Sequence, residues 1–195
     1  MPMLAALVLG LCATWSAQAA ETWVLLPAPK FMGYEVTRPI AGAKSTVLAV
    51  AKLGAYGTEF PTAAEWQAVG MTDEALTEAA AAQAAAWLKE LTPELVRDPQ
   101  KVVRYAVLQS QQWPIAATVL VPEFWRRFEP IFGAKLKVAM PNRYTVYVFP
   151  DLGADLQEHV PMVIRAWRSR QPKVSLEVFE LTEKGMQAVA SFEEP

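Results

Sequence analysis

An α+β fold is predicted for this chain: a single domain with a largely antiparallel sheet and two or three helices packed on one face. Three observations predict it. From residue 104 onward the pattern reads strand, strand, helix, strand, strand, helix, strand. The connections between successive strands are short, which favours hairpins over parallel crossovers. Ahead of these strands, an alanine-rich stretch has the apolar spacing of a long helix.

The first residues have the features of a cleavable export signal. Residues 4–11 are apolar, no charged side chain precedes Glu21, and Ala17-Gln18-Ala19 supplies small residues at a cleavage site. A transmembrane helix needs roughly 20 apolar residues, and this run is much shorter. We therefore expect a signal peptide over residues 1–20 and a mature domain over 21–195. That domain should be periplasmic or secreted and should have no stable membrane span.

Two other interpretations of this start are open. Cys12 is the residue type to which a lipoprotein lipid is attached, but Leu11 stands where that processing needs a small residue. Residues 4–19 are also long enough to form a buried helix. The charge-free run and the Ala-Gln-Ala site favour export.

The first half of the mature chain predicts two strands and one long helix. Residues 46–53 indicate a strand and residues 22–26 a possible one, with a proline- and glycine-rich loop between them. Thr72 can cap a helix that Thr92-Pro93 ends. The residues expected to face inward on this helix share one side of it: Leu76, Ala80, Ala84, Trp87 and Leu91.

The second half predicts a series of strands interrupted by two helices. The strands are expected at 104–108, 115–121, 136–140, 145–149 and 174–181. Pro122 should open a short helix that Gly133 ends. A longer helix should run to Arg170. We expect it to start near His159, with Pro161 in its first turn, although a start near Gly153 with a kink at the proline is the alternative.

The composition excludes several classes of function. The formal net charge of −2 argues against a nucleic-acid-binding protein, which usually carries a strongly basic face. Cys12 is the only cysteine and is removed with the predicted signal, and His159 is the only histidine. Cysteine nucleophiles and metal sites built from cysteine or several histidines are therefore excluded, and we expect neither a metal nor a cofactor.

One pair of residues suggests weak catalytic potential. His159 could act as a general base with Glu158 beside it. A single histidine at the edge of an apolar helix face is more often a boundary residue, so we predict no catalytic residue beyond these two candidates. The corresponding alternative function is a small periplasmic hydrolase or transferase that uses carboxylates.

Arginines and tryptophans supply a candidate recognition surface. The arginines lie on the short helix, on a turn and near the end of the long helix, where solvent exposure alone would also explain them. Trp66 and Trp113 lie beside predicted loops, although packing is the ordinary role of tryptophan. The residues proposed for a ligand or partner surface are Arg126, Arg127, Arg143, Arg165, Arg168, Trp66 and Trp113. The leading hypothesis is a non-catalytic domain that binds a protein or a cell-envelope component.

From Trp66 onward the chain resembles the YtpQ-like bacterial family of uncharacterised proteins, a domain of unknown function. The resemblance is strongest over residues 66–185. It is carried by WQAVGMTDEALTEAAAAQAAAWL at 66–88, VLVPEFWRRF at 119–128, KVAMPNRYTVYVF at 137–149 and VSLEVFEL at 174–181. The resemblance implies an α+β fold and no established activity, so it assigns no functional residue. The export signal is a departure from that family, whose members are cytoplasmic.

Overall fold

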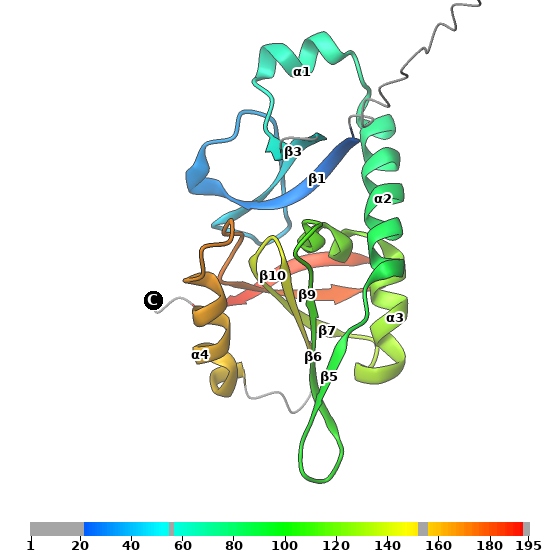
Figure 1. Ribbon diagram of the computed structural model, residues 1–195, viewed down its shortest axis with the longest axis vertical. Helices are drawn as coiled ribbons and strands as arrows, with labels where there is room; N and C mark the ends of the chain where they lie inside the picture. Colours follow the sequence, from blue (N-terminus) through cyan, green and yellow to red (C-terminus); the bar gives the residue numbers. More distant parts are fainter. Residues whose placement is uncertain (1–21, 55–56, 152–155, 193–195) are drawn as a thin grey trace, which may run out of the picture.

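A computed structural model describes residues 22–54, 57–151 and 156–192 (Figure 1). Two antiparallel sheets and the helices packed against them form an α+β fold, as predicted. The predicted signal peptide over residues 1–20 lies outside the described residues.

In chain order the elements are β1 (Thr22–Pro29), η1 (Lys30–Met32), β2 (Thr37–Pro39), β3 (Thr46–Gly54), β4 (Gly57–Glu59), α1 (Ala63–Val69), α2 (Asp73–Glu90), β5 (Glu94–Arg97), β6 (Val103–Gln109), η2 (Ile115–Leu120), α3 (Pro122–Phe132), β7 (Leu136–Asn142), β8 (Thr145–Pro150), α4 (Leu156–Trp167), β9 (Glu177–Thr182) and β10 (Gly185–Ser191).

The smaller sheet has the order β1-β3-β2, with β4 also paired to β3. Strand β1 continues through Pro27 and Pro29, beyond the predicted end at residue 26. Because β1 pairs only with β3, it is an edge strand, where the missing proline N–H groups can be tolerated. The segment predicted as loop after it contains the short η1 and β2.

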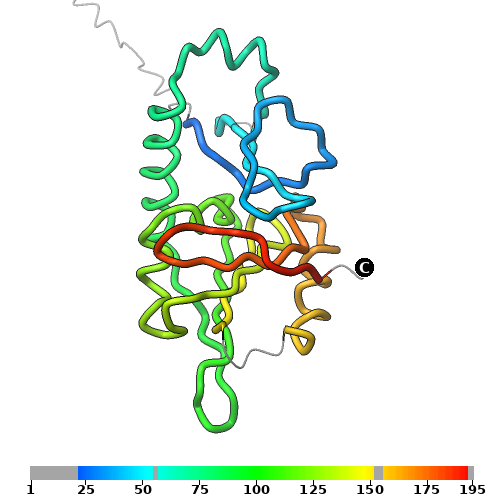
Figure 2. The backbone as a smooth tube through the Cα atoms, turned by 180° about the vertical axis from the view of Figure 1, so that it is seen from behind, coloured from blue at the N-terminus to red at the C-terminus, as the bar shows by residue number. Residues whose placement is uncertain are grey.

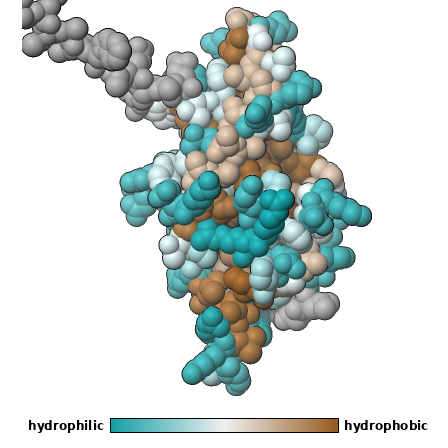
Figure 3. All heavy atoms as spheres, turned by 90° about the vertical axis from the view of Figure 1, so that its right-hand side faces the viewer, coloured by the Kyte–Doolittle hydropathy of each residue, from teal (hydrophilic) through white to brown (hydrophobic). Residues whose placement is uncertain are grey.

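The larger sheet has the order β10-β9-β7-β8-β6-β5, and every neighbouring pair is antiparallel. The predicted hairpin of residues 136–140 and 145–149 is confirmed as β7 and β8. At the far edge, the β5–β6 hairpin extends away from the body of the protein (Figures 1 and 2). Figure 3 shows apolar surface in this lower region, ending at a hydrophilic tip.

Both faces of the larger sheet are buried. Leu108, Val138 and Val148 face a core shared with α2, η2 and α3, the largest core of the described residues. The alternate residues, including Ala139 and Phe149, face a second core closed by α4. Helices therefore cover both faces of this sheet, and the expectation of helices on one face is corrected. Alternation alone could not show this, because many residues on both sides of these strands are apolar.

The long helix α2 follows the sequence prediction. The Thr72 hydroxyl accepts a hydrogen bond from Ala75 N and caps its start. The inward face is buried at Leu76, Ala80, Ala84 and Trp87, as the helical spacing predicted. The short helix α3 begins at Pro122 and is followed by Gly133, also as predicted.

Residues 115–121, predicted as a strand, form the short 3₁₀ helix η2 instead. Five of its six residues are buried, and β6 pairs directly with β8, which leaves no strand position for this segment. A continuous apolar run does not distinguish a buried strand from a buried helix. The proline on each side of the run favours a short, isolated element here.

Three other predicted boundaries also change. Helix α4 ends at Trp167 instead of Arg170, and Pro161 lies inside it instead of in its first turn. The final predicted strand starts at Glu177 instead of residue 174, because Val174 N and Ser175 N donate to Pro141 O and Met140 O outside the regular ladder. The last strand, β10, was not predicted.

Candidate functional site

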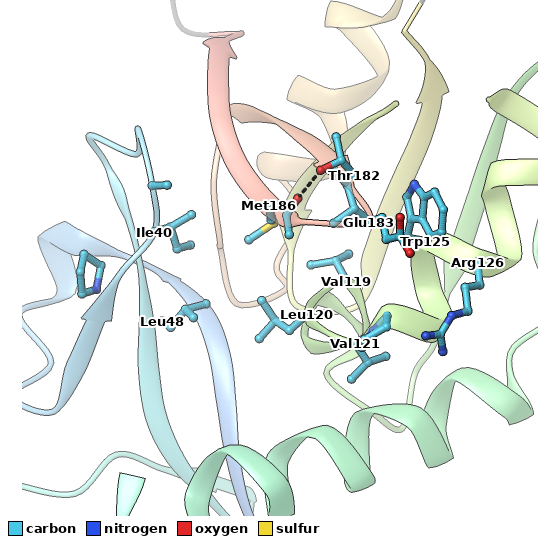
Figure 4. Close-up of a pocket in the computed structure, with 15 residues that line it drawn as sticks. Ile40, Leu48, Val119, Leu120, Val121, Trp125, Arg126, Thr182, Glu183 and Met186 are labelled. Atoms are coloured by element: carbon cyan, nitrogen blue, oxygen red, sulfur yellow. Dashed lines mark hydrogen bonds between the residues drawn. The ribbon is translucent and has the colours of Figure 1, made fainter. Parts of the chain in front are cut away.

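An apolar cleft lies where the smaller sheet meets the larger one (Figure 4). Its volume is about 440 Å³, within the range of about 300–1,000 Å³ typical of ligand sites. Three parts of the chain line it: residues 39–41 with Leu48 from the smaller sheet, residues 119–122 with Trp125 and Arg126, and the β9–β10 hairpin. Figure 4 shows Ile40 and Leu48 reaching from the smaller sheet toward Leu120 and Met186.

Polar side chains in the cleft are few and lie on one side of it. Arg126 and Glu183 stand at the end of the cleft beside Trp125 (Figure 4). The Arg126 side chain is 66% exposed and lies 3.9 Å from Glu123, so it has only a loose ion pair. The Thr182 hydroxyl donates to Gly185 O at 3.4 Å within the hairpin turn. The cleft therefore offers apolar contact along its length and a cation and an anion at one end.

A charged groove continues from this cleft. It has a volume of about 700 Å³ and shares the side chains of Trp125, Glu183 and Met186 with the cleft. Its other lining residues include both signs of charge: Glu129, Lys135, Glu180 and Lys184. A cleft lined mainly by apolar side chains thus opens into a groove with side chains of both charges, which suits a ligand with an apolar part next to charged groups.

Helix α3 positions the aromatic wall of the cleft. Phe124 and Phe128 are buried in the core on one face of this amphipathic helix. Trp125 lies one position further around the helix, half-buried, and its Nε1 donates to Ala134 O at 3.0 Å. That hydrogen bond fixes the indole at the junction of the cleft and the groove.

The hairpin wall of the cleft is joined to the smaller sheet by close backbone contact. Ala188 N donates to Ala41 O at 2.8 Å, and Ala41 forms an isolated bridge with Gln187. Gly42 has a φ of 72° and no room for a side chain, since a Cβ there would lie 2.6 Å from Ala188 O. The cleft is therefore formed between segments that the chain brings together from distant positions.

The two neighbouring arginines of α3 have different roles. Arg126 lines the cleft. Arg127 points the other way and donates to Leu88 O at 2.7 Å and to Leu91 O at 2.6 Å, so it binds the carbonyls at the end of α2. Burial lowers the pKa of Arg127. Its role in the fold is structural.

Arg143 is also occupied inside the fold. It is only 7% exposed, lies over the ring of Phe60 at 4.8 Å and donates from Nη2 to the Tyr34 hydroxyl at 3.2 Å. Its Nε has no hydrogen-bond partner. In the described ranges no carboxylate lies in ion-pair distance of this guanidinium.

The predicted arginine surface is not one patch. Arg165 and Arg168 are exposed at the end of α4, which covers the opposite face of the larger sheet from α3 (Figure 1). They cannot act together with Arg126. The helical spacing within each helix could be predicted, but the side of the sheet on which each helix lies could not.

The two predicted tryptophans do not line the cleft. Trp66 packs edge-on against Trp23 at 5.2 Å, and Trp113 is half-buried against the main core. Both border smaller hollows or cores elsewhere in the protein. The tryptophan that does line the cleft is Trp125, which was not among the predicted surface residues. Its position next to the buried Phe124 on an amphipathic helix was the available signal.

The weak catalytic candidates lie apart from every cavity described above. Glu158 forms an exposed ion pair with Arg104 at 3.3 Å. His159 is 9% exposed, stacks on Phe149 at a centroid distance of 4.9 Å and meets Tyr105 edge-on at 5.0 Å. This aromatic packing gives the imidazole a role in the second core.

The described residues contain no group of three or more His, Cys, Asp or Glu side chains arranged to hold a metal ion. No helix in this part of the chain has the length and apolar character needed to cross a membrane.

No family model matches this chain, and neither a curated protein nor a solved structure matches it. The resemblance to the YtpQ-like family therefore stays a prediction.

Proposed function

We propose that this protein is an exported, non-catalytic domain that binds an apolar segment of a protein partner in the cleft between its two sheets. The observation that carries the proposal is the continuity of the apolar cleft with the charged groove. The export signal of residues 1–20 supports a periplasmic or secreted location.

The shape of the site favours a peptide segment over a compact small molecule. The cleft and the groove share one wall, the β9–β10 hairpin, and so form one continuous site along it. A chain lying along this wall can place one or two apolar side chains against Leu120 and Met186. Its neighbouring charged residues then meet Arg126, Glu183 and Lys184. Buried apolar anchors provide most of the affinity in such interfaces, and rim charges provide orientation.

A library of random short peptides displayed on phage tests this proposal directly. Panning against the folded protein should enrich peptides that carry an apolar anchor beside charged residues. Binding should be lost in M186E, which places a charge inside the cleft. The matched control is V189E on the same strand, where Val189 is 44% exposed and outside the cleft lining. Thermal unfolding of both variants verifies that they are folded.

A second variant tests peptide binding without changing a packed side chain in the cleft. Arg126 is exposed, so R126E should leave the fold intact and shift the preferred charge of the selected peptides from acidic to basic. R168E, on the opposite side of the larger sheet, is the control and should leave the preference unchanged. The proposal fails if no peptide is enriched, or if the enriched peptides bind M186E as well as the unchanged protein.

A further inference from the structure

Two adjacent apolar side chains project from the end of β1. Phe31 is 70% exposed and Met32 is 53% exposed, and both belong to the short helix η1 that Gly33 ends. Lys30 precedes them and is also exposed. A large aromatic and a methionine side by side in solvent are unusual for a tight turn, and paired exposed apolar side chains mark contact surfaces.

A basic segment follows helix α4. Arg165, Arg168, Arg170 and Lys173 are all exposed. From His159 through Leu176 the sequence contains no acidic residue. None of the three arginines forms an ion pair within the described ranges, and the Lys173 ammonium lies 5.2 Å from the ring centre of Trp167. Among the described residues, these four cations therefore have no carboxylate partner.

The β7–β8 turn holds this segment beside the loop that carries Phe31. Asn142 Nδ2 donates to Ala166 O at 3.0 Å. Arg143 N donates to Pro172 O at 3.0 Å, and the Arg143 side chain donates to the Tyr34 hydroxyl. One turn thus contacts both the end of α4 and the residue two positions after Met32.

Both segments lie on the same side of the protein. In Figure 1 the η1 loop and α4 form its left edge, and the reversed view in Figure 2 places them together on the right edge. Glu35 is the carboxylate nearest to η1 in the sequence, and it accepts a hydrogen bond from Ala63 N at 2.8 Å. We call the surface formed by Lys30, Phe31, Met32, Arg165, Arg168, Arg170 and Lys173 the basic face.

We propose that the basic face docks on an anionic phospholipid bilayer, with Phe31 and Met32 inserted between the headgroups and the arginines at the phosphates. The combination of exposed apolar tips and exposed cations is the chemistry that a charged lipid surface recognises. The formal net charge of −2 and the predicted export both disfavour a nucleic acid as the ligand of this face. The proposal concerns a different surface from the cleft. The β9–β10 turn and α3 lie on the other side of the protein in Figure 1, so docking leaves the cleft accessible.

Sedimentation of the folded protein with lipid vesicles tests the proposal. The protein should bind vesicles of mixed phosphatidylglycerol and phosphatidylcholine, release with rising salt, and bind phosphatidylcholine vesicles weakly. R168Q/R170Q removes two surface charges and should weaken binding on the order of twentyfold. K89Q/K101Q, which removes two exposed charges elsewhere, should have little effect.

The apolar half of the proposal has its own variant. F31S/M32S should weaken binding roughly tenfold or more, since two apolar side chains no longer leave water. The control is V102S, where Val102 is 57% exposed at the distant β5–β6 hairpin. M186E should bind vesicles as well as the unchanged protein does. Vesicle binding can therefore be judged separately from peptide binding in the cleft.

Binding that depends on the arginines but is unchanged in F31S/M32S would assign the face to a soluble polyanion and overturn the proposal. Equal binding to neutral vesicles would overturn it too.

Discussion

The Thr46 hydroxyl lies 2.5 Å from Glu177 Oε2 and joins the smaller sheet to the larger one. The other carboxylate oxygen of Glu177 accepts hydrogen bonds from Lys44 N at 2.6 Å and Ser45 N at 3.2 Å. Glu177 is 5% exposed and Thr46 2%. A buried carboxylate thus binds the start of β3 from across the junction of the sheets.

Removing this junction contact should destabilise the protein. T46V keeps the shape of the side chain but leaves the carboxylate with one partner fewer, and E177Q removes the charge that strengthens the bonds. Each should lower the free energy of unfolding by about 1–3 kcal/mol. Urea denaturation measures the change. E183Q, at an exposed glutamate on the same hairpin, should change it by less than about 0.5 kcal/mol.

Arg127 should be far more important to stability than Arg126. R127M removes two hydrogen bonds from a charged donor to carbonyls at the end of α2, and should lower the free energy of unfolding by about 1–3 kcal/mol or more. R126M removes an exposed charge with a loose partner and should have almost no effect. Parallel thermal and urea unfolding of the two variants provides the comparison. Equal stabilities would contradict the helix-capping role of Arg127.

A side chain at Gly42 should weaken the contact between the smaller sheet and β10. In G42A the Cβ would meet Ala188 O, and the φ of 72° is disfavoured for alanine. We expect a lower melting temperature and faster hydrogen exchange at Ala188 N, which donates to Ala41 O. G33A is the matched control, because Gly33 has a φ of 67° and open space around it. If both variants lose the same stability, only backbone strain is involved.

Lys137 should control part of the pH dependence of stability. Its ammonium lies 2.8 Å from Glu180 Oε2 and 2.9 Å from Asp151 Oδ1. The hydrogen bond from Lys137 lowers the pKa of Glu180. Burial opposes the charge of Lys137, but its bonds to Glu180 and Asp151 outweigh burial and raise its pKa.

The lowered pKa of Glu180 and the raised pKa of Lys137 affect stability in two different pH ranges. The stability from Glu180 is present above the unfolded pKa of about 4.3 and is lost as pH falls through the lower folded value. The stability from Lys137 is present below about pH 10.4 and is lost as pH rises through the higher folded value. K137M should therefore flatten both limbs of a plot of unfolding free energy against pH. K89M, at an exposed lysine, should leave both limbs unchanged.

The sequence predicts elements that have their own start and stop signals. Pro122 and Gly133 bound α3, and Thr72 caps α2, because these residues act within a single turn of helix. Strand β10 has no such signal, since GMQAVAS has one β-branched residue, Val189, and no aromatic residue. It forms because the turn at Gly185 folds it back onto β9.

The candidate site was less predictable than the fold. Arg126 and Arg127 are adjacent and of one type, yet one lines the cleft and the other binds α2, because successive helical residues point about 100° apart. Met186 gave no signal, since it lies on an unpredicted strand. The cleft itself needs residues from three distant segments, and their arrangement depends on which side of the sheet each element packs.

The contact between Thr46 and Glu177 also bears on how the chain folds, because it joins residues 131 positions apart. The smaller sheet is formed by the first strands, yet its junction with the larger sheet needs β9 and β10, the last two. Contacts between such distant residues require slow loop closure, so we expect folding to finish only after nearly the whole chain is available. We expect a chain that folds this late to stay unfolded during synthesis, which is the state that the proposed export through a narrow channel would require.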